Sequence, residues 1–113
     1  MKIAFTTKGT SWDSKIDPRF GRTEYLLVFD EENNETKTVD NREVSQEAHG
    51  VGPKTAKLIF DLGVDTLITG NGPGGNAATV LEKSGTKIFI GAGDNTVKEA
   101  YDAFKKGTLK EFI

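Results

Sequence analysis

The chain has 113 residues, of which 35% are hydrophobic and 28% are charged, and this ordinary composition predicts one globular domain covering residues 1–113. It contains no cysteine, which excludes disulfides, cysteine-ligated zinc, thiol nucleophiles and iron–sulfur clusters held by the chain's own thiolates. The formal net charge of −2 gives no general attraction to polyanions, so we expect neither nucleic acid nor a membrane surface as a partner.

The first half of the chain predicts three strands. Residues 2–6 (KIAFT) form a short apolar run, typical of a strand that is buried on both faces. The segment 7–23 is a long loop rich in Gly, Ser and Asp, and loops of this length in compact domains are often functional. Residues 24–30 (EYLLVFD) and 35–40 (ETKTVD) follow as strands joined by the turn 31–34, and the polar side chains of the third strand suit a sheet edge.

The second half alternates helices with strands. After a loop over 41–52, helices are predicted at residues 53–62, 76–83 and 94–106. Apolar strands precede the last two helices, at residues 64–69 and 86–90. Thr96 and Glu99 have the spacing of a capping box in the third helix, and Gly107 ends it. The remaining tail, 109–113, is expected to dock through its apolar residues Leu109, Phe112 and Ile113.

This order of elements predicts an α/β fold of three layers. Short connections make the first three strands antiparallel neighbours, whereas the helical crossovers make the later strands parallel. The simplest result is a five-stranded mixed sheet with order 3-2-1-4-5, strand 2 antiparallel, and helices on both faces. Four loops then leave the same side of the sheet, which we call the loop edge: residues 7–23, 41–52, 70–76 and 91–95. In open α/β sheets ligands bind at this side.

The glycine turn at residues 70–75 (GNGPGG) matches the pattern GxGxxG between a strand and a helix. The strand before it is not the first in the chain, which disfavours a dinucleotide site, and the glycines also suit a tight turn that lets helix and sheet pack closely. Either way, the turn places backbone N–H groups at a helix N-terminus, where an anion binds. The candidate binding residues are Asn71, Gly72, Gly74, Gly75 and Asn76.

His49 is the only histidine, and it lies in the loop 41–52 just before a predicted helix. It is the candidate metal ligand, able to supply one bond to a preformed metal species, or a proton-transfer group; the alternative is a loop histidine that faces water. Arg19 and Arg22 lie in the segment 17–22 (DPRFGR) and are candidates for binding phosphate, carboxylate or an anionic cluster. Their alternative role is to pair with nearby acidic residues and hold the loop.

The long loop contains two aromatic residues that also have alternative roles. Phe20 is expected to anchor the loop in the core, whereas Trp12 is left open between a loop anchor and an exposed contact for a protein partner. No apolar run approaches the ~20 residues needed to span a bilayer, and the first residues do not form a signal peptide. We therefore expect a cytoplasmic monomer.

Taken together, these motifs resemble the dinitrogenase iron–molybdenum cofactor biosynthesis family over nearly the whole chain. The residues that carry the resemblance are the start KIAF, Asp17 to Arg22 followed by Tyr25, His49 to Gly52, Gly72-Pro73, Asn76-Ala77, and Gly85 to Phe89 with Gly91. The resemblance implies a ribonuclease H-like fold, with a five-stranded mixed sheet between helices. It also implies binding and delivery of the iron–molybdenum cofactor, or of its iron–sulfur cluster precursor, as cargo.

In the cofactor-carrying members histidine and cysteine are the implied cluster contacts, and here only His49 matches. The family also has small single-domain members outside nitrogen fixation, and this chain resembles that branch. Our first hypothesis is a non-enzymatic carrier of an anionic metal cluster or small anion at the loop edge. The alternatives are an enzyme or binder acting on a phosphorylated metabolite or nucleotide there, and an interaction module that docks a protein partner.

Overall fold

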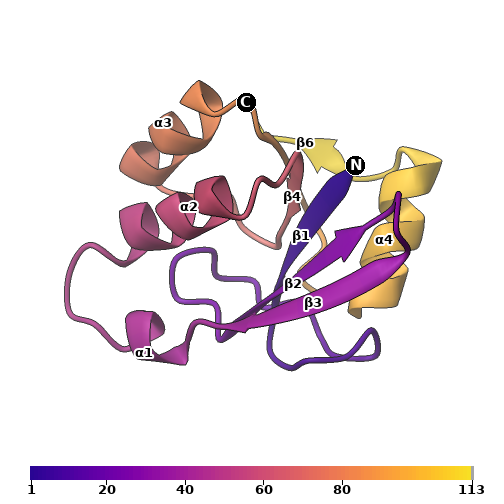
Figure 1. Cartoon of the computed structure of the whole chain (residues 1–113), viewed down its shortest axis with the longest axis horizontal. Coiled ribbons are helices and arrows are strands. Elements are labelled where there is room, and N and C mark those ends of the chain that lie inside the picture. Colours follow the sequence, from indigo (N-terminus) through magenta and orange to yellow (C-terminus); the bar gives the residue numbers. More distant parts are fainter. Residues whose placement is uncertain (113) are drawn as a thin grey trace.

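The computed structural model describes residues 1–112, and within them one six-stranded sheet runs in the order β3-β2-β1-β4-β5-β6 (Figure 1). Its strands are β1 (Lys2–Thr7), β2 (Tyr25–Asp30), β3 (Glu35–Asp40), β4 (Thr66–Ile68), β5 (Lys87–Ile90) and β6 (Lys110–Glu111). β1 lies parallel to β4 and β4 to β5, whereas β2 is antiparallel to both of its neighbours. The predicted order of the first five strands and the reversed direction of the second are confirmed.

The prediction of five strands was wrong, because part of the tail 109–113 forms a sixth. Lys110 and Glu111 pair antiparallel with β5, with Glu111 opposite Phe89. A two-residue strand has no detectable side-chain periodicity, but the open N–H and C=O groups at the edge of β5 need partners. Residue 113, the last of the tail, lies outside the described residues.

Helices cover both faces of the sheet (Figure 1). α2 (Val51–Asp61) and α3 (Gly75–Lys83) pack on one face over an apolar cluster that includes Ala4, Leu26 and Leu67. α4 (Val97–Lys106) packs on the other, over a second cluster. The predicted capping box is confirmed: Thr96 and Glu99 bond reciprocally, so α4 begins at Val97, three residues later than expected. A short helix that was not predicted, α1 (Arg42–Ser45), interrupts the loop 41–52.

The long loop after β1 is anchored on both faces of the sheet. Phe20 is buried in the α2–α3 cluster, whereas Ile16 is buried in the α4 cluster. Trp12 is a loop anchor, since its ring packs edge-on against Phe5 and Phe29, and its Nε1–H donates to Thr36 across the sheet. The loop therefore crosses the end of the sheet, and its middle is held between the two layers.

Glu31, between β2 and β3, connects this hairpin to α4. The hydroxyl of Tyr101 donates to its carboxylate at 2.6 Å and Lys105 at 2.9 Å, and these bonds lower the pKa of Glu31. A lowered pKa means that the bonds stabilise the fold fully above the ordinary value of 4.5, and that this contribution is lost as pH falls through the folded-state pKa.

We therefore expect Glu31→Gln to lower the free energy of unfolding by about 1 kcal/mol at pH 7. The difference from the wild type should fade as the pH falls below 4.5. Urea denaturation at pH 7 and at acidic pH measures it, with the exposed neighbour Glu32→Gln as the control. If the variant is less stable than the wild type by the same amount in acid, the stabilisation does not come from the ionised carboxylate of Glu31, and the prediction is wrong.

None of the helices described in residues 1–112 combines the length and apolar character needed to cross a membrane.

Candidate functional site

The four predicted loops meet at the loop edge, and the segment 17–22 lies in contact with the glycine turn there. The N–H of Asn71 donates to the carbonyl of Pro18 at 2.8 Å, and the N–H of Gly91 donates to the carbonyl of Gly70 at 3.0 Å. Gly70 lies so close to the loop that an added Cβ would sit 2.6 Å from the Pro18 Cα. Glycine is therefore required at position 70 for close approach of two backbones.

The same segment also contacts the start of α2. A Cβ on Gly21 would lie 2.9 Å from the Cα of Gly52, and the Gly21 carbonyl accepts a bond from the hydroxyl of Thr55 at 2.9 Å. Residues 17–22 thus fill the space between the α2 N-terminus and the turn after β4. The sequence predicted that these loops share an edge, but not that 17–22 is the piece connecting them.

Asp17 holds this connecting segment in place. Its carboxylate is completely buried and accepts both Nε–H and Nη2–H of Arg19 at 3.0 Å, together with the backbone N–H groups of Arg19 and Glu24. The hydrogen bonds to Asp17 raise the pKa of Arg19 above its ordinary value. The Arg19 side chain remains 53% exposed, so it holds the loop and also presents positive charge at the surface.

Arg22 is likewise engaged within the protein. Its Nη1 donates to the carbonyls of Ser45 at 2.9 Å and Glu47 at 3.1 Å, which are free acceptors at the end of α1. Arg19 therefore pairs with an acidic residue and holds the loop, as the alternative prediction had it, whereas Arg22 holds the loop through backbone carbonyls and not through an acidic side chain. Each guanidinium still has further N–H donors for a ligand, because five are available and these bonds do not use them all.

A buried amide was missed by the sequence analysis. Asn41 is 1% exposed, and its Nδ2 donates to the carbonyl of Thr23 and to the hydroxyl of Thr55. Its Oδ1 is buried without a hydrogen-bond partner among residues 1–112. Nothing in the local sequence distinguishes this asparagine from a solvated loop residue, since its burial depends on contacts with the distant residues Thr23 and Thr55.

The N-termini of α2 and α3 open side by side at the loop edge. The N-cap residues are Gly50 and Gly74, neither N-cap has a side-chain hydrogen bond, and neither first turn carries an acidic residue. The two helices pack closely, with only 3.5 Å between the Ala77 Cβ and a Cβ built on Gly52. Unsatisfied N–H groups and two helix dipoles thus create positive potential at one place.

The glycine turn that precedes α3 is half open. Gly74 and Gly75 are exposed, and a Cβ on either would meet no atom within 4 Å, so a ligand can approach their backbone closely. Asn71 and Asn76 are exposed beside them. Gly72 is different, because the ring of Phe112 covers its Cα. Of the residues predicted in this turn, therefore, Gly72 is covered, and the accessible ones are Asn71, Gly74, Gly75 and Asn76.

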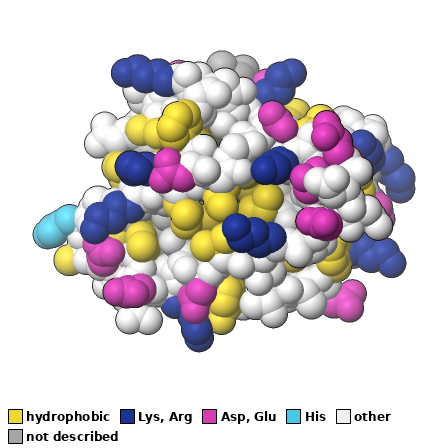
Figure 2. Space-filling model, viewed as in Figure 1, with side chains coloured by type: hydrophobic (Ala, Val, Ile, Leu, Met, Phe, Trp, Pro, Cys, Tyr) yellow, Lys and Arg dark blue, Asp and Glu magenta, His cyan; other side chains and the backbone are white. Residues whose placement is uncertain are grey.

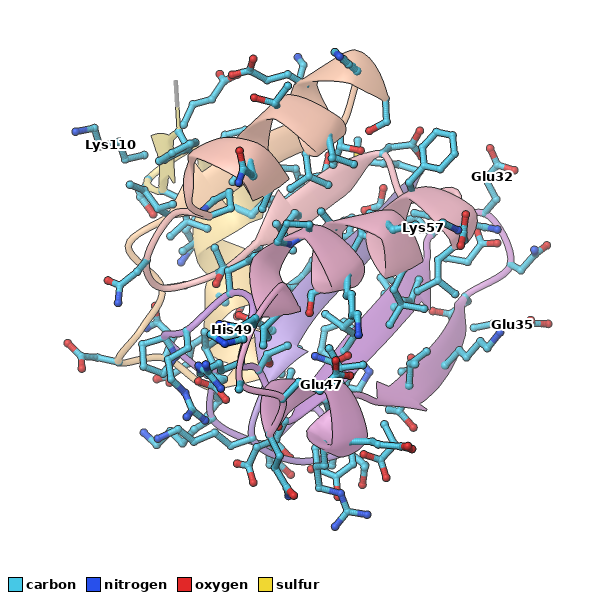
Figure 3. All side chains as sticks on the ribbon, turned by 90° about the vertical axis from the view of Figure 1, so that its left-hand side faces the viewer. Glu32, Glu35, Glu47, His49, Lys57 and Lys110 are labelled. Carbon is cyan, nitrogen blue, oxygen red and sulfur yellow. The ribbon has the colours of Figure 1, made fainter. Side chains whose placement is uncertain are left out.

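His49 lies next to Gly50, the N-cap of α2, and its side chain is exposed. Figure 3 shows it on the connection between α1 and α2, and Figure 2 shows the only histidine extending from the surface. Among the described residues its imidazole makes no hydrogen bond within the protein, and no group of three or more His, Asp or Glu side chains could hold a metal ion. A metal species could therefore receive one bond from His49, and the predicted ligand role stays a prediction.

Comparison with known proteins identifies the family. A family model described as dinitrogenase iron-molybdenum cofactor matches residues 1–107. The chain belongs to this family. An uncharacterized protein of Methanocaldococcus jannaschii is 31% identical over 99% of this chain and 92% of its own length. The resemblance seen in the sequence is thus confirmed.

Solved structures of similar proteins agree in fold. The apo form of the orange protein from Desulfovibrio gigas has a TM-score of 0.91 at 31% identity, covering 98% of this chain and 92% of that one. A Thermotoga protein proposed to be NifB and assigned to the DUF35 family has a TM-score of 0.83 at 36% identity, covering 97% and 91%.

Proposed function

We propose that the protein binds and carries an anionic metal cluster at its loop edge, and that it does not catalyse a reaction there. The observation that carries this proposal is the pair of adjacent helix N-termini, α2 and α3, without side-chain caps or acidic residues in their first turns. Each N-terminus contributes the equivalent of about half a positive charge. Two of them at one place favour a ligand with more than one negative charge.

The cargo we propose is the iron–molybdenum cofactor or an iron–sulfur precursor, or a related cluster in a process other than nitrogen fixation. Membership of the family and the names of its structural neighbours support this choice. With no cysteine in the chain, the cluster would be held by backbone N–H groups of residues 74–76, by the exposed charge of Arg19, and by one bond from His49. Weak holding of this kind suits delivery.

The absence of catalysis is part of the proposal and rests on how the ionisable groups are engaged. Asp17 is bonded to Arg19 and to backbone N–H groups, so its carboxylate is occupied in holding the loop. Acid–base catalysis commonly uses a histidine held by a second residue, and within residues 1–112 His49 has no such partner. The carrier role therefore needs fewer assumptions than an enzyme does.

The two alternatives differ in their support. A phosphorylated metabolite or nucleotide would suit the same N–H groups, although the position of the GxGxxG turn after a strand that is not the first disfavours a dinucleotide. An interaction module based on Trp12 is less well supported, because the Trp12 ring packs within the protein against Phe5, Phe29 and Tyr101.

We further propose that the fold is of the ribonuclease H type and that the carrier is monomeric, consistent with the mixed sheet covered on both faces.

Titration followed by NMR tests the carrier role. The probes are molybdate, a synthetic [4Fe–4S] cluster with thiolate ligands, and inorganic phosphate as the competing ligand class. Binding should shift the amide signals of Gly52, Gly74 and Gly75 and the imidazole signals of His49. Preference for phosphate over both metal species would favour the metabolite alternative, and no shift with any probe at millimolar concentration would overturn the proposal.

Asn76→Asp places a negative charge in the first turn of α3 and is expected to weaken molybdate binding about tenfold by charge repulsion. The matched control is Asn34→Asp, which makes the same change at an exposed site at the far end of β2, a strand of six residues spanning about 20 Å. Its effect should stay within about twofold, since charges separated by more than the Debye length are screened. Equal weakening by both variants would indicate a nonspecific charge effect.

A further inference from the structure

The three heavy atoms nearest to the space where Gly72 would carry a Cβ all belong to the ring of Phe112, and the ring would overlap that atom. The contact joins residues 40 positions apart, and it involves a part of the chain beyond residues 1–107, the stretch that the family model matches. The contact between Phe112 and Gly72 is therefore not among the features matched by the family model, and its role must be inferred from this structure.

The geometry points to Phe112 as a positioning residue for the glycine turn. We infer that the strap formed by residues 110–112 closes one side of the turn, and that the ring on Gly72 holds the backbone of residues 72–75 in its binding conformation. The other side of the turn is already held, since Gly70 abuts Pro18 and the N–H of Asn71 bonds to the Pro18 carbonyl. The ring of Phe112 is the group that lies nearest to Gly72 on the side where a Cβ would point.

The strap itself is lightly attached. Both residues of β6 are exposed, and Phe112 is half-buried against the α2–α3 cluster, with its N–H donating to the carbonyl of Ile88 at 2.7 Å. A two-residue strand and one partly buried ring can detach without unfolding the sheet. The strap can therefore control how well ordered the turn is, independently of global stability.

A substitution at Gly72 tests this contact without adding backbone strain, because its backbone does not lie in the left-handed region that favours glycine. The atoms nearest to an alanine Cβ at this position are those of the Phe112 ring, which it would overlap. We therefore expect Gly72→Ala and Phe112→Ala each to disturb the turn. In the double variant, however, Gly72→Ala should add nothing, because the obstructing ring has been removed.

Amide hydrogen exchange in the ligand-free protein measures the order of the turn. The reporters are the bonded amides on either side of it, Asn71, which donates to Pro18, and Ala78, which donates to Gly74. Phe112→Ala and Gly72→Ala should each speed their exchange by at least about fivefold. Exchange at Ala4 in β1 should stay unchanged. Phe112→Leu should partly restore protection, and Phe60→Ala, which removes an exposed ring on α2, should have no effect.

The link to ligand binding rests on the proposed function and is measured separately, with molybdate as the probe. Phe112→Ala should weaken its binding at least about threefold, because a disordered turn must be ordered on binding. If exchange at Asn71 and Ala78 is unchanged in both single variants, or if Phe112→Ala tightens binding, the inference is overturned. If exchange responds as expected while the wild type binds none of the probes, the positioning role stands and the proposed function fails.

Discussion

Replacing Asp17 with asparagine is expected to lower the free energy of unfolding by about 3 kcal/mol. The carboxylate is completely buried, and its Oδ2 accepts from Arg19 Nη2 at 3.0 Å and from the backbone N–H of Glu24 at 3.2 Å. If the asparagine NH₂ occupies the Oδ2 position, it cannot accept hydrogen bonds. The Arg19 Nη2–H and the Glu24 N–H then lose their acceptor. Chemical denaturation followed by tryptophan fluorescence measures the loss, because the only tryptophan lies in the same long loop.

The chain contains its own control for this experiment. Asp40 and Arg42 form a pair with the same spacing and the same kinds of bond from the arginine, through its backbone N–H, Nε and Nη2, and these bonds lower the pKa of Asp40 to about 2. This second pair is exposed, with 52% of the Asp40 side chain accessible. Asp40→Asn should leave the denaturation midpoint unchanged, since water replaces the lost bonds. Equal effects from the two variants would mean that burial of Asp17 contributes nothing.

The second large effect is expected for Gly70→Ala, which should cost about 3 kcal/mol by overpacking. The new Cβ would lie 2.6 Å from the Pro18 Cα and 3.0 Å from the Gly93 Cα. Both obstacles are backbone atoms, so no side-chain rotation relieves them. The turn must move away from residues 17–22, which breaks the bond from the Asn71 N–H to Pro18.

Gly93→Ala is the matched control, because Gly93 faces Gly70 but has space. Its Cβ would lie 3.6 Å from the Pro18 Cβ and 3.7 Å from the Gly70 Cα, which are ordinary contacts. We expect a change within about 0.5 kcal/mol. The denaturation midpoints of the Gly70→Ala and Gly93→Ala variants measure the difference. A Gly70→Ala variant as stable as the wild type would show that the glycine turn and residues 17–22 are not in close contact in solution.

The arrangement of the first five strands could be predicted because connection lengths determine it. The turn 31–34 allows only an antiparallel pair, and the helices before β4 and β5 require parallel crossovers. From this order it follows that the loops after β1, β3, β4 and β5 meet at one edge. The position of the loop edge, where the candidate site lies, thus follows from the topology alone.

The roles of individual residues at that edge could not be predicted, because they depend on contacts between distant segments. Whether Arg22 faces a ligand or the protein is decided by the end of α1, a four-residue helix too short to show periodicity. The burial of Asn41 and the ring of Phe112 over Gly72 likewise arise from packing between elements. Local pattern identified the glycines, but only the assembled fold separates the covered Gly72 from the open Gly74.

The charges on the two outermost strands have a consequence for association between molecules. Within the described residues, β3 carries Glu35, Lys37 and Asp40, and β6 carries Lys110 and Glu111, so each edge of the sheet ends in charged side chains. Such edges resist pairing with a strand of another chain. Without β6, the edge would be KIFI of β5, a β-prone apolar sequence of the kind that aggregates. The last described residues therefore also protect the protein from edge-to-edge polymerisation.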